Sequence, residues 1–139
     1  MVMSAKRLTI YTDGASKGNP GPAAIGVVIE DESGQVINQI SRRIGEATNN
    51  RAEYLALIAG VEEAARLGAE HVEVRSDSEL LVRQIAGQYR VKNPELKRLF
   101  EQVQRLIRKF QSFSIVHIPR GQNKAADALS RRALRKAGG

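Results

Sequence analysis

Apolar and polar residues alternate along the first third of the chain, and the period then changes. Residues 7–13 alternate, residues 24–29 are continuously apolar, and residues 35–44 alternate again. A period of two is typical of half-buried strands. Residues 31–34, between the last two segments, have the composition of a tight turn. The pattern predicts three successive antiparallel strands.

The remainder of the chain is mostly helical in its pattern. Residues 50–67 carry apolar side chains on nearly every side, which predicts a largely buried helix. In residues 95–110 the apolar side chains recur at spacings of three and four, and most basic side chains lie outside that stripe. Among the later segments, we expect a strand over residues 72–74 and a helix over residues 78–86. The amphipathic helix at residues 95–110 is then followed by a strand over residues 113–118 and a helix over residues 123–136.

The resulting element order is βββαβααβα, which indicates an α/β fold. Strands reached through helical crossovers are usually parallel to the strand they join. We therefore expect a five-stranded mixed sheet, with three antiparallel strands followed by two parallel ones, flanked by helices. A chain of 139 residues fits a single domain over residues 1–139, with a core of about 7–135 and a short basic C-terminal tail.

The composition excludes several classes of protein. Cysteine is absent, so no disulfide framework, thiolate zinc site or cysteine nucleophile can form. Aromatic residues make up 4% of the chain and tryptophan is absent, which argues against a base-stacking platform for single strands. No apolar run approaches the ~18 residues of a membrane span. We expect a cytoplasmic protein, monomeric and without an obligatory protein partner.

Charge is unevenly distributed along the chain. Residues 1–89 carry 9 Lys and Arg against 12 Asp and Glu, a net charge of −3, whereas residues 90–139 carry 13 against 3, a net charge of +10. A basic half indicates either a polyanionic partner such as nucleic acid or simply a solubilising surface. Carboxylates gathered in the other half are unusual for a protein that only binds phosphates.

Four carboxylates of the chain are candidates for chemistry, three in the acidic half and one in the basic half, and each also has a purely structural explanation. Asp13 lies at the end of the first strand, directly before Gly14, where a turn aspartate is common. Glu53 lies in the apolar helix, either as a buried carboxylate that needs a cation or in a capping box with Asn50. Asp77 is well placed to cap a helix, and Asp127 to complement a helix dipole.

Considered together, the four carboxylates follow one rule of placement. Asp13 and Asp77 end strands, while Glu53 and Asp127 occupy early turns of helices. If the two strands are neighbouring and parallel, their carboxyl ends meet at one edge of the sheet. Carboxylates crowded there would repel one another unless divalent cations held them. Oxygen ligands favour Mg²⁺ or Mn²⁺ over Zn²⁺, and such a cluster suits two-metal phosphoryl chemistry.

Two segments of the chain have distinctive sequences: residues 11–22 read Tyr-Thr-Asp-Gly-Ala-Ser-Lys-Gly-Asn-Pro-Gly-Pro, and residues 48–53 read Thr-Asn-Asn-Arg-Ala-Glu. They resemble the opening motif and the second motif of a known family, type 1 ribonuclease H. Residues 76–78 and 123–127 are similar to the third and fourth. The match is collinear and covers roughly residues 7–135.

The resemblance implies an endonuclease that cuts the RNA strand of an RNA–DNA hybrid, leaving 3′-hydroxyl and 5′-phosphate ends. It implies two Mg²⁺ or Mn²⁺ ions, held with substrate bound by the four carboxylates. It also implies that Asn19, Asn49 and Asn50 line the groove between the hybrid's strands, and that Thr48 contributes to a pocket for a DNA-strand phosphate. Short amides can read a 2′-hydroxyl because they both donate and accept. Helix capping is the alternative explanation for Thr48, Asn49 and Asn50.

The chain departs from the family pattern in two places. Many members have a histidine in the loop before the last motif, whereas residues 119–122 here contain none. We expect Arg120 to take its place near the scissile phosphate, His117 to be structural and His71 to lie at the surface.

The second departure is that residues 87–94 are too short for the basic protrusion of some members. We expect the electrostatic grip on substrate to be shared by the polar face of residues 95–110 and by other basic residues. These are Arg90, Lys92, Arg131, Arg132, Arg135 and Lys136.

Three other functions stay open at this level. The first is a catalytically silent hybrid- or RNA-binding module on the same fold, against which the intact carboxylates argue. The second is a nuclease of the same superfamily that acts on DNA, against which the motif at residues 48–50 argues. The third is a structural protein associated with ribosomes or the nucleoid, which rests on charge alone.

Overall fold

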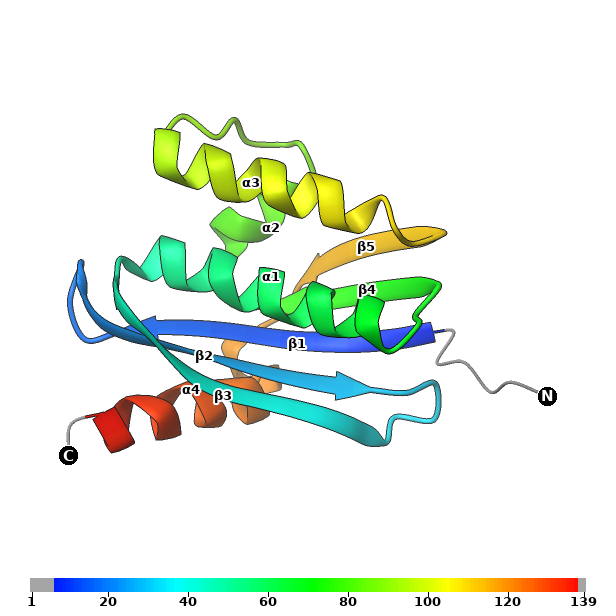
Figure 1. The fold of residues 1–139 in the computed structure, drawn as a ribbon, viewed down its shortest axis with the longest axis horizontal. Coiled ribbons are helices and arrows are strands. Elements are labelled where there is room, and N and C mark those ends of the chain that lie inside the picture. The colour runs from blue at the N-terminus through cyan, green and yellow to red at the C-terminus, as the bar shows by residue number, and fades with distance from the viewer. Residues whose placement is uncertain (1–6, 138–139) are drawn as a thin grey trace.

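The computed structural model describes residues 7–137, which form a sheet with helices on both faces (Figure 1). Helices α1, α2 and α3 lie on one side of the sheet and α4 on the other. The elements in chain order are β1 (Arg7–Ser16), β2 (Gly21–Glu30), β3 (Val36–Ala47), α1 (Asn49–Arg66), β4 (His71–Ser76), α2 (Glu79–Ile85), α3 (Pro94–Ile107), β5 (Ser112–His117), the 3₁₀ turn η1 (Arg120–Gln122) and α4 (Lys124–Ala137).

The five strands of the sheet have the spatial order β3-β2-β1-β4-β5. Strands β1, β2 and β3 pair antiparallel, while β4 is parallel to both β1 and β5. The expected fold class is therefore confirmed, including the change from antiparallel to parallel pairing at β1. The turn expected at residues 31–34 is also present: the Gly34 amide donates to the Asp31 carbonyl (3.0 Å), and Gly34 has the positive φ of 84° that favours glycine.

Strand β1 is longer than the sequence pattern predicted. The alternating pattern predicted a strand over residues 7–13, but β1 continues to Ser16 because β2 pairs with it along its whole second half, from Asp13↔Gly26 to Ser16↔Ala23. The parallel pairing with β4 stops earlier, at Thr12↔Ser76. Asp13 therefore does not end the strand; it is the first residue beyond the part of β1 that pairs with β4.

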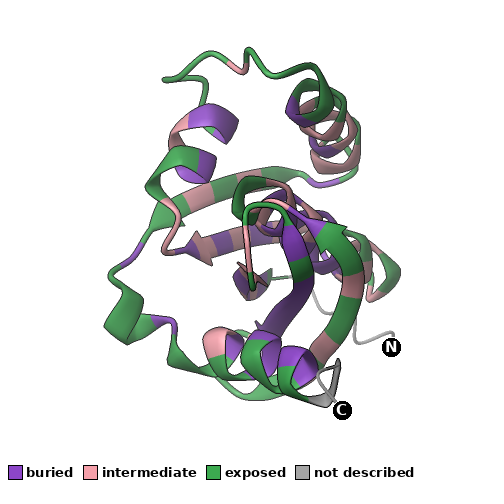
Figure 2. Ribbon diagram, turned by 90° about the vertical axis from the view of Figure 1, so that its left-hand side faces the viewer, coloured by how far each residue is buried: buried purple, intermediate pink, exposed green. Residues whose placement is uncertain are grey.

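The hydrophobic core has one layer on each face of the sheet. Helix α1 packs between the sheet and α3, and its residues Ala56, Leu57 and Val61 are fully buried, as its apolar pattern predicted. On the other face α4 packs mainly on β2. Figure 2 shows the buried residues gathered where strands and helices face each other.

Helix α3 ends at Ile107, three residues before the predicted end. The chain then turns so that the Gln111 amide donates to the Glu70 carbonyl (2.7 Å), which ties the start of β5 to the start of β4. Phe110 is still buried, although outside the helix. Among residues 7–137, no helix combines the length and the apolarity that crossing a membrane requires.

Candidate active site

Three carboxylates from three different elements meet at one edge of the sheet. Asp13 comes from β1, Glu53 from the second turn of α1, and Asp77 directly follows β4. One oxygen from each lies within 4.8 Å of the others. Asp13 is buried (6% exposed), whereas Asp77 is partly exposed. The predicted convergence of these three side chains is present.

The register between β1 and β4 brings Asp13 and Asp77 together. Thr12 and Ser76 are partners in the parallel ladder, so Asp13 and Asp77 are the next residues on adjacent strands. Adjacent strands lie roughly 4.8 Å apart. Two carboxylates at this position are neighbours as a consequence of backbone pairing alone.

Glu53 reaches the same edge because β1 passes directly under the first turns of α1. The Gly14 amide donates to Glu53 Oε1 (2.9 Å). A Cβ on Gly14 would lie 2.3 Å from the Ala52 carbonyl carbon, so only glycine permits this approach. The capping-box interpretation of Glu53 with Asn50 is wrong: Thr48 caps α1 by accepting from the Arg51 amide.

The capping interpretation of Asp77 is also wrong. The N-cap of α2 is Ser78, whose hydroxyl accepts from the Leu81 amide at 3.3 Å. Asp77 stands one residue before the cap, and its carboxylate faces the other two acids.

Asp127 lies on the same cavity, but outside the group of three. It is in the first turn of α4, where its charge does complement the helix dipole. Its carboxylate pairs with Arg131 at 3.0 Å, and its side chain is 26% exposed. The cavity, of about 360 Å³, is lined by all four carboxylates together with Arg120 and Arg131.

Burial and mutual repulsion make this edge electrostatically costly. The pKa of Asp13 is raised to about 6, chiefly by burial and to a lesser extent by the charges of Asp77 and Asp127, while the Ser130 hydroxyl opposes the rise. Burial also raises the pKa of Glu53 well above its ordinary value, with the Asp13 charge as the next cause. Arg120 is the nearby cation that lowers both values. An edge that disfavours ionised acids in this way is suited to bind additional positive charge.

Sequence reasoning missed two residues of this cluster. Ser130 on α4 is fully buried and donates to Asp13 Oδ2 at 2.6 Å. Asn123, which we noted only as part of the fourth motif, is 1% exposed and donates to Asp77 Oδ2 at 3.3 Å. One signal was available: Ser130 stands in the buried stripe that Ala126, Leu129 and Ala133 mark along α4.

Two of the residues expected to contact substrate, Asn49 and Arg120, line the cavity of the carboxylates. Asn19 Oδ1 accepts from the Asn49 amide (3.0 Å), which joins the loop after β1 to the start of α1. Asn19, Asn49 and Asn50 are exposed, and Asn49 lines the cavity of the carboxylates. Thr48 is partly buried as the cap of α1. Arg120 is exposed in η1 and also lines the cavity.

The two histidines lie outside the cavity. His117 ends β5 and is exposed, so it is not a core residue. His71 is at the opposite end of the sheet, where its Nδ1 is 2.8 Å from the Ser112 hydroxyl.

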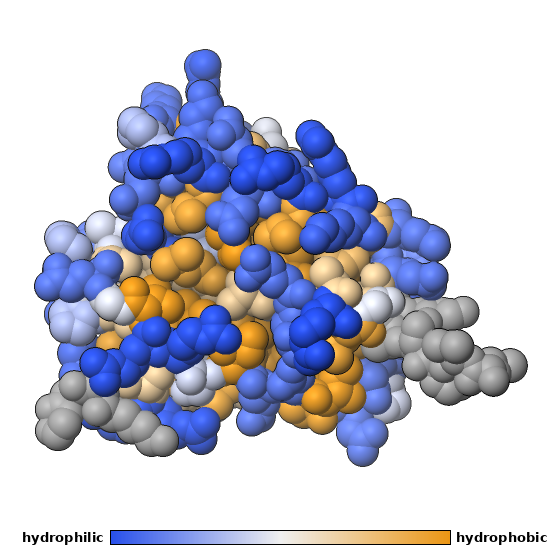
Figure 3. Space-filling view, viewed as in Figure 1, coloured by the Kyte–Doolittle hydropathy of each residue, from blue (hydrophilic) through white to orange (hydrophobic). Residues whose placement is uncertain are grey.

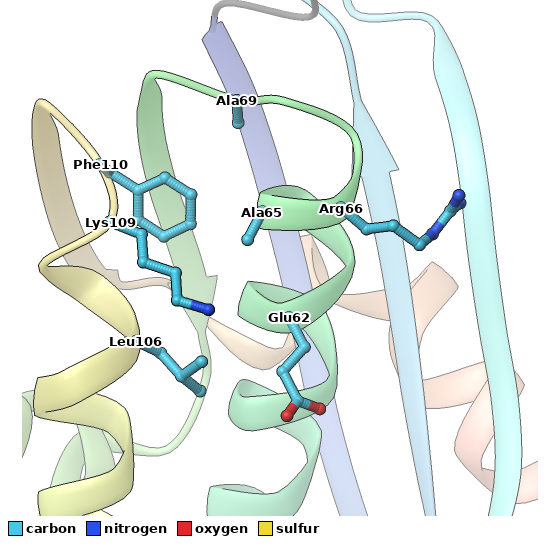
Figure 4. Close-up of a pocket in the computed structure, with 7 residues that line it drawn as sticks. All are labelled: Glu62, Ala65, Arg66, Ala69, Leu106, Lys109 and Phe110. Carbon is cyan, nitrogen blue, oxygen red and sulfur yellow. The ribbon is translucent and has the colours of Figure 1, made fainter.

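A second hollow, of about 440 Å³, lies at the far end of α1, between α1 and α3. Its floor is apolar, with Ala65, Leu106 and Phe110, and Figure 3 shows apolar surface between charged side chains on this face. Figure 4 shows the Lys109 side chain extending from α3 toward α1, while the Arg66 side chain points away from α3. With a single carboxylate it offers none of the chemistry of the first cavity.

Known proteins resemble the chain over most of its length. A family model described as reverse transcriptase-like matches residues 11–133. The chain is 44% identical over 128 residues to ribonuclease HI of Halobacterium salinarum and 41% identical over 129 residues to a bifunctional protein of Mycobacterium tuberculosis. Each alignment covers 92% of this chain, but only 64% and 35% of those proteins. The chain thus spans between about one third and two thirds of these relatives.

Two solved structures superpose on most of the chain. The crystal structure of RNase H1 from Halobacterium salinarum has a TM-score of 0.92 at 44% identity, covering 94% of this chain and 98% of that one. LC11-RNase H1, solved in complex with an RNA/DNA hybrid, has a TM-score of 0.91 at 47% identity, covering 95% and 99%.

Proposed function

The chain belongs to the type 1 ribonuclease H family, and on this premise we propose that it hydrolyses the RNA strand of RNA–DNA hybrids. Cleavage is endonucleolytic and leaves 3′-hydroxyl and 5′-phosphate ends. The relative LC11-RNase H1, which was solved with a hybrid, supports this choice of substrate. We also propose that residues 1–139 act as one monomeric, cytoplasmic domain.

The observation that carries the proposal is the convergence of Asp13, Glu53 and Asp77. Their oxygens lie within 4.8 Å of one another, at an edge where burial and like charges disfavour ionised acids. A protein that only bound hybrids would gain nothing from this arrangement, which costs stability. Chemistry that requires cations explains it.

The donor set fits a hard divalent cation. All three side chains offer carboxylate oxygens, the ligands that Mg²⁺ and Mn²⁺ prefer. We propose two such ions in the substrate complex, held by Asp13, Glu53, Asp77 and Asp127 as catalytic ligands. When bound, these ions activate a water and stabilise the leaving oxygen. In this scheme the Arg131–Asp127 pair must loosen for Asp127 to contribute.

Substrate recognition is proposed for the exposed amides beside the cavity. The Asn19 side chain accepts from the Asn49 main chain, and Asn50 is the next residue. The side-chain amides of all three can donate to and accept from a 2′-hydroxyl. Thr48 is proposed to contribute to a pocket for a DNA-strand phosphate in addition to its capping role. The exposed cations Arg90, Lys92, Arg132 and Arg135 supply phosphate contacts.

The test is cleavage of three end-labelled duplexes, an RNA–DNA hybrid, a DNA duplex and an RNA duplex, each with and without Mg²⁺ or Mn²⁺. We expect cleavage of the RNA strand of the hybrid only when metal is present, and no cleavage of duplex DNA. Equal cleavage of duplex DNA would favour the alternative of a DNA nuclease. Binding of the hybrid without cleavage under either metal would favour a silent binding module.

Arg120→Ala is expected to lower kcat on the hybrid by about tenfold, a loss of about 1.4 kcal/mol of transition-state stabilisation. Arg120 is the cation that faces Asp13 and Glu53 across the cavity, and it is placed to meet the scissile phosphate. Steady-state kinetics on a labelled hybrid measures the change. The matched control is Arg66→Ala at the far end of α1, an exposed arginine whose pair with Glu63 contributes little. Unchanged kcat and hybrid affinity for Arg120→Ala would remove Arg120 from the site.

A further inference from the structure

Helix α4 lies on the face of the sheet opposite α1 (Figure 1). The helix and the residue directly before it carry two buried polar side chains that contact the carboxylate cluster. These are Ser130, in the second turn of the helix, and Asn123, directly before its first residue. Each makes a hydrogen bond to a different carboxylate, Ser130 to Asp13 and Asn123 to Asp77.

The hydroxyl of Ser130 has two acceptors within reach. Asp13 Oδ2 lies at 2.6 Å and the Asp127 carbonyl at 2.9 Å, so a purely local bond within the helix was available to it. The contact with Asp13 is shorter and charge-assisted, and such bonds are about twice as strong as neutral ones. Ser130 is fully buried, so no water competes for this hydroxyl.

Asn123 joins both strands that carry the acids. Its Nδ2 donates to the Thr12 carbonyl on β1 (2.9 Å) and lies 3.3 Å from Asp77 Oδ2 beyond β4. Its Oδ1 is buried without a hydrogen-bond partner among residues 7–137. A buried polar atom without a partner costs about 1–3 kcal/mol. Because the buried Oδ1 of Asn123 costs stability, the presence of this side chain is better explained by the hydrogen bonds that its Nδ2 donates.

Among residues 7–137, each of the three clustered carboxylates accepts one hydrogen bond, and α4 together with the residue directly before it supplies two of the three donors. The donor to Glu53 is the main-chain amide of Gly14, so the path of the backbone alone determines where this donor lies. The terminal torsion of a carboxylate is broad, so the hydrogen bonds from Ser130 and Asn123 decide how Asp13 and Asp77 present their oxygens. An oxygen that accepts one hydrogen bond keeps a second lone pair, so these bonds do not prevent metal binding.

We propose that Ser130 and Asn123 are positioning residues that hold Asp13 and Asp77 in the orientation that binds divalent cations. The inference rests on the proposed metal site. Loss of a residue that orients a metal ligand typically weakens metal affinity by about 10- to 100-fold.

A simpler explanation is that Ser130 only anchors α4 to the sheet, and the chain offers a matched control for it. The Ser41 hydroxyl on β3 donates to the Leu129 carbonyl of α4 at 2.7 Å and makes no hydrogen bond to a carboxylate. Ser41→Ala and Ser130→Ala therefore each remove one serine hydroxyl that bonds α4 to the sheet, and only the second removes a contact with Asp13.

The experiment is calorimetric titration of Mn²⁺ into the metal-free protein without hybrid, together with thermal melting and hybrid kinetics. We expect Ser130→Ala and Asn123→Ala each to weaken Mn²⁺ binding about tenfold and to lower kcat at unchanged KM. Ser41→Ala should keep Mn²⁺ affinity within about twofold of wild type, even where its melting temperature falls as far as that of Ser130→Ala. If Asn123→Ala does not fold, Ser130→Ala alone decides.

Two negative results have different meanings. If the wild-type protein binds Mn²⁺ and Ser130→Ala binds it equally well, the positioning role is overturned and the proposed function is untouched. If the wild-type protein takes up no Mn²⁺ at all, the proposed metal site fails, and the positioning role fails with it.

Discussion

Asp13→Asn is expected to abolish hybrid cleavage and, at the same time, to raise the melting temperature of the metal-free protein. The loss of activity follows from removing the most buried ligand of the cluster. If the metal it holds supplies on the order of 4 kcal/mol of transition-state stabilisation, turnover falls about 10³-fold. Labelled-hybrid kinetics with Mg²⁺ and with Mn²⁺ measures this loss.

The gain in stability follows from the sign of the pKa shift. The pKa of Asp13 is raised from 3.8 to about 6 by burial, so the folded state binds this proton more tightly than the unfolded chain does. The ionised carboxylate therefore costs stability above pH 6, and the cost disappears as the pH falls below about 4. A shift of that size corresponds to ~3 kcal/mol, and removing it should raise the melting temperature by roughly 10 °C at neutral pH.

Melting in EDTA at pH 8 and at pH 4.5 tests this. The rise should be present at pH 8 and largely gone at pH 4.5, and added Mn²⁺ should stabilise the wild type more than the variant. The control is Asp31→Asn in the turn between β2 and β3, where hydrogen bonds from Ser33 and Gln35 lower the pKa of the acid. That substitution should not raise the melting temperature. A lower melting temperature for Asp13→Asn at pH 8 would contradict the account of a strained cluster.

The meeting of Asp13 and Asp77 could be predicted from the sequence because it depends only on where the parallel pairing of two neighbouring strands ends, at Thr12 and Ser76. The caps could not be placed, because Thr, Asn, Ser and Asp are all good N-caps and neighbouring candidates compete. Thr48 caps α1 where Asn50 was a candidate, and Ser78 caps α2 beside Asp77. An error of one or two residues in the cap changed the interpretation of each neighbouring acid.

The contacts that complete the site are long-range, and periodicity alone cannot reveal them. Ser130 stands 117 positions from Asp13, and Asn123 stands 111 from Thr12. The pattern of α4 can mark Ser130 as buried, but it contains no information on which strand residue lies opposite. The position of α4 on the sheet decides which strand residue lies opposite Ser130, and Gly26 determines that position.

Gly26 on β2 lies directly under α4, and it pairs with Asp13 across the sheet. A Cβ on Gly26 would lie 2.1 Å from the Ala126 carbonyl oxygen and 2.7 Å from the Ser130 amide nitrogen. Both atoms belong to the helix backbone, which cannot move away by changing a rotamer. The helix as a whole must lift, and it carries Ser130 and Asp127 with it.

Gly26→Ala is therefore expected to destabilise the protein by about 3 kcal/mol, at the upper end of ordinary overpacking. For a chain of this size the melting temperature should fall by roughly 10 °C. Where the variant folds, turnover should fall by about 10²-fold, the typical effect of a 1 Å misplacement. Gly121→Ala is the control, since its Cβ would meet nothing within 4 Å and its φ is not left-handed. Equal melting temperatures for the two variants would show that α4 does not depend on Gly26 for its position over the site.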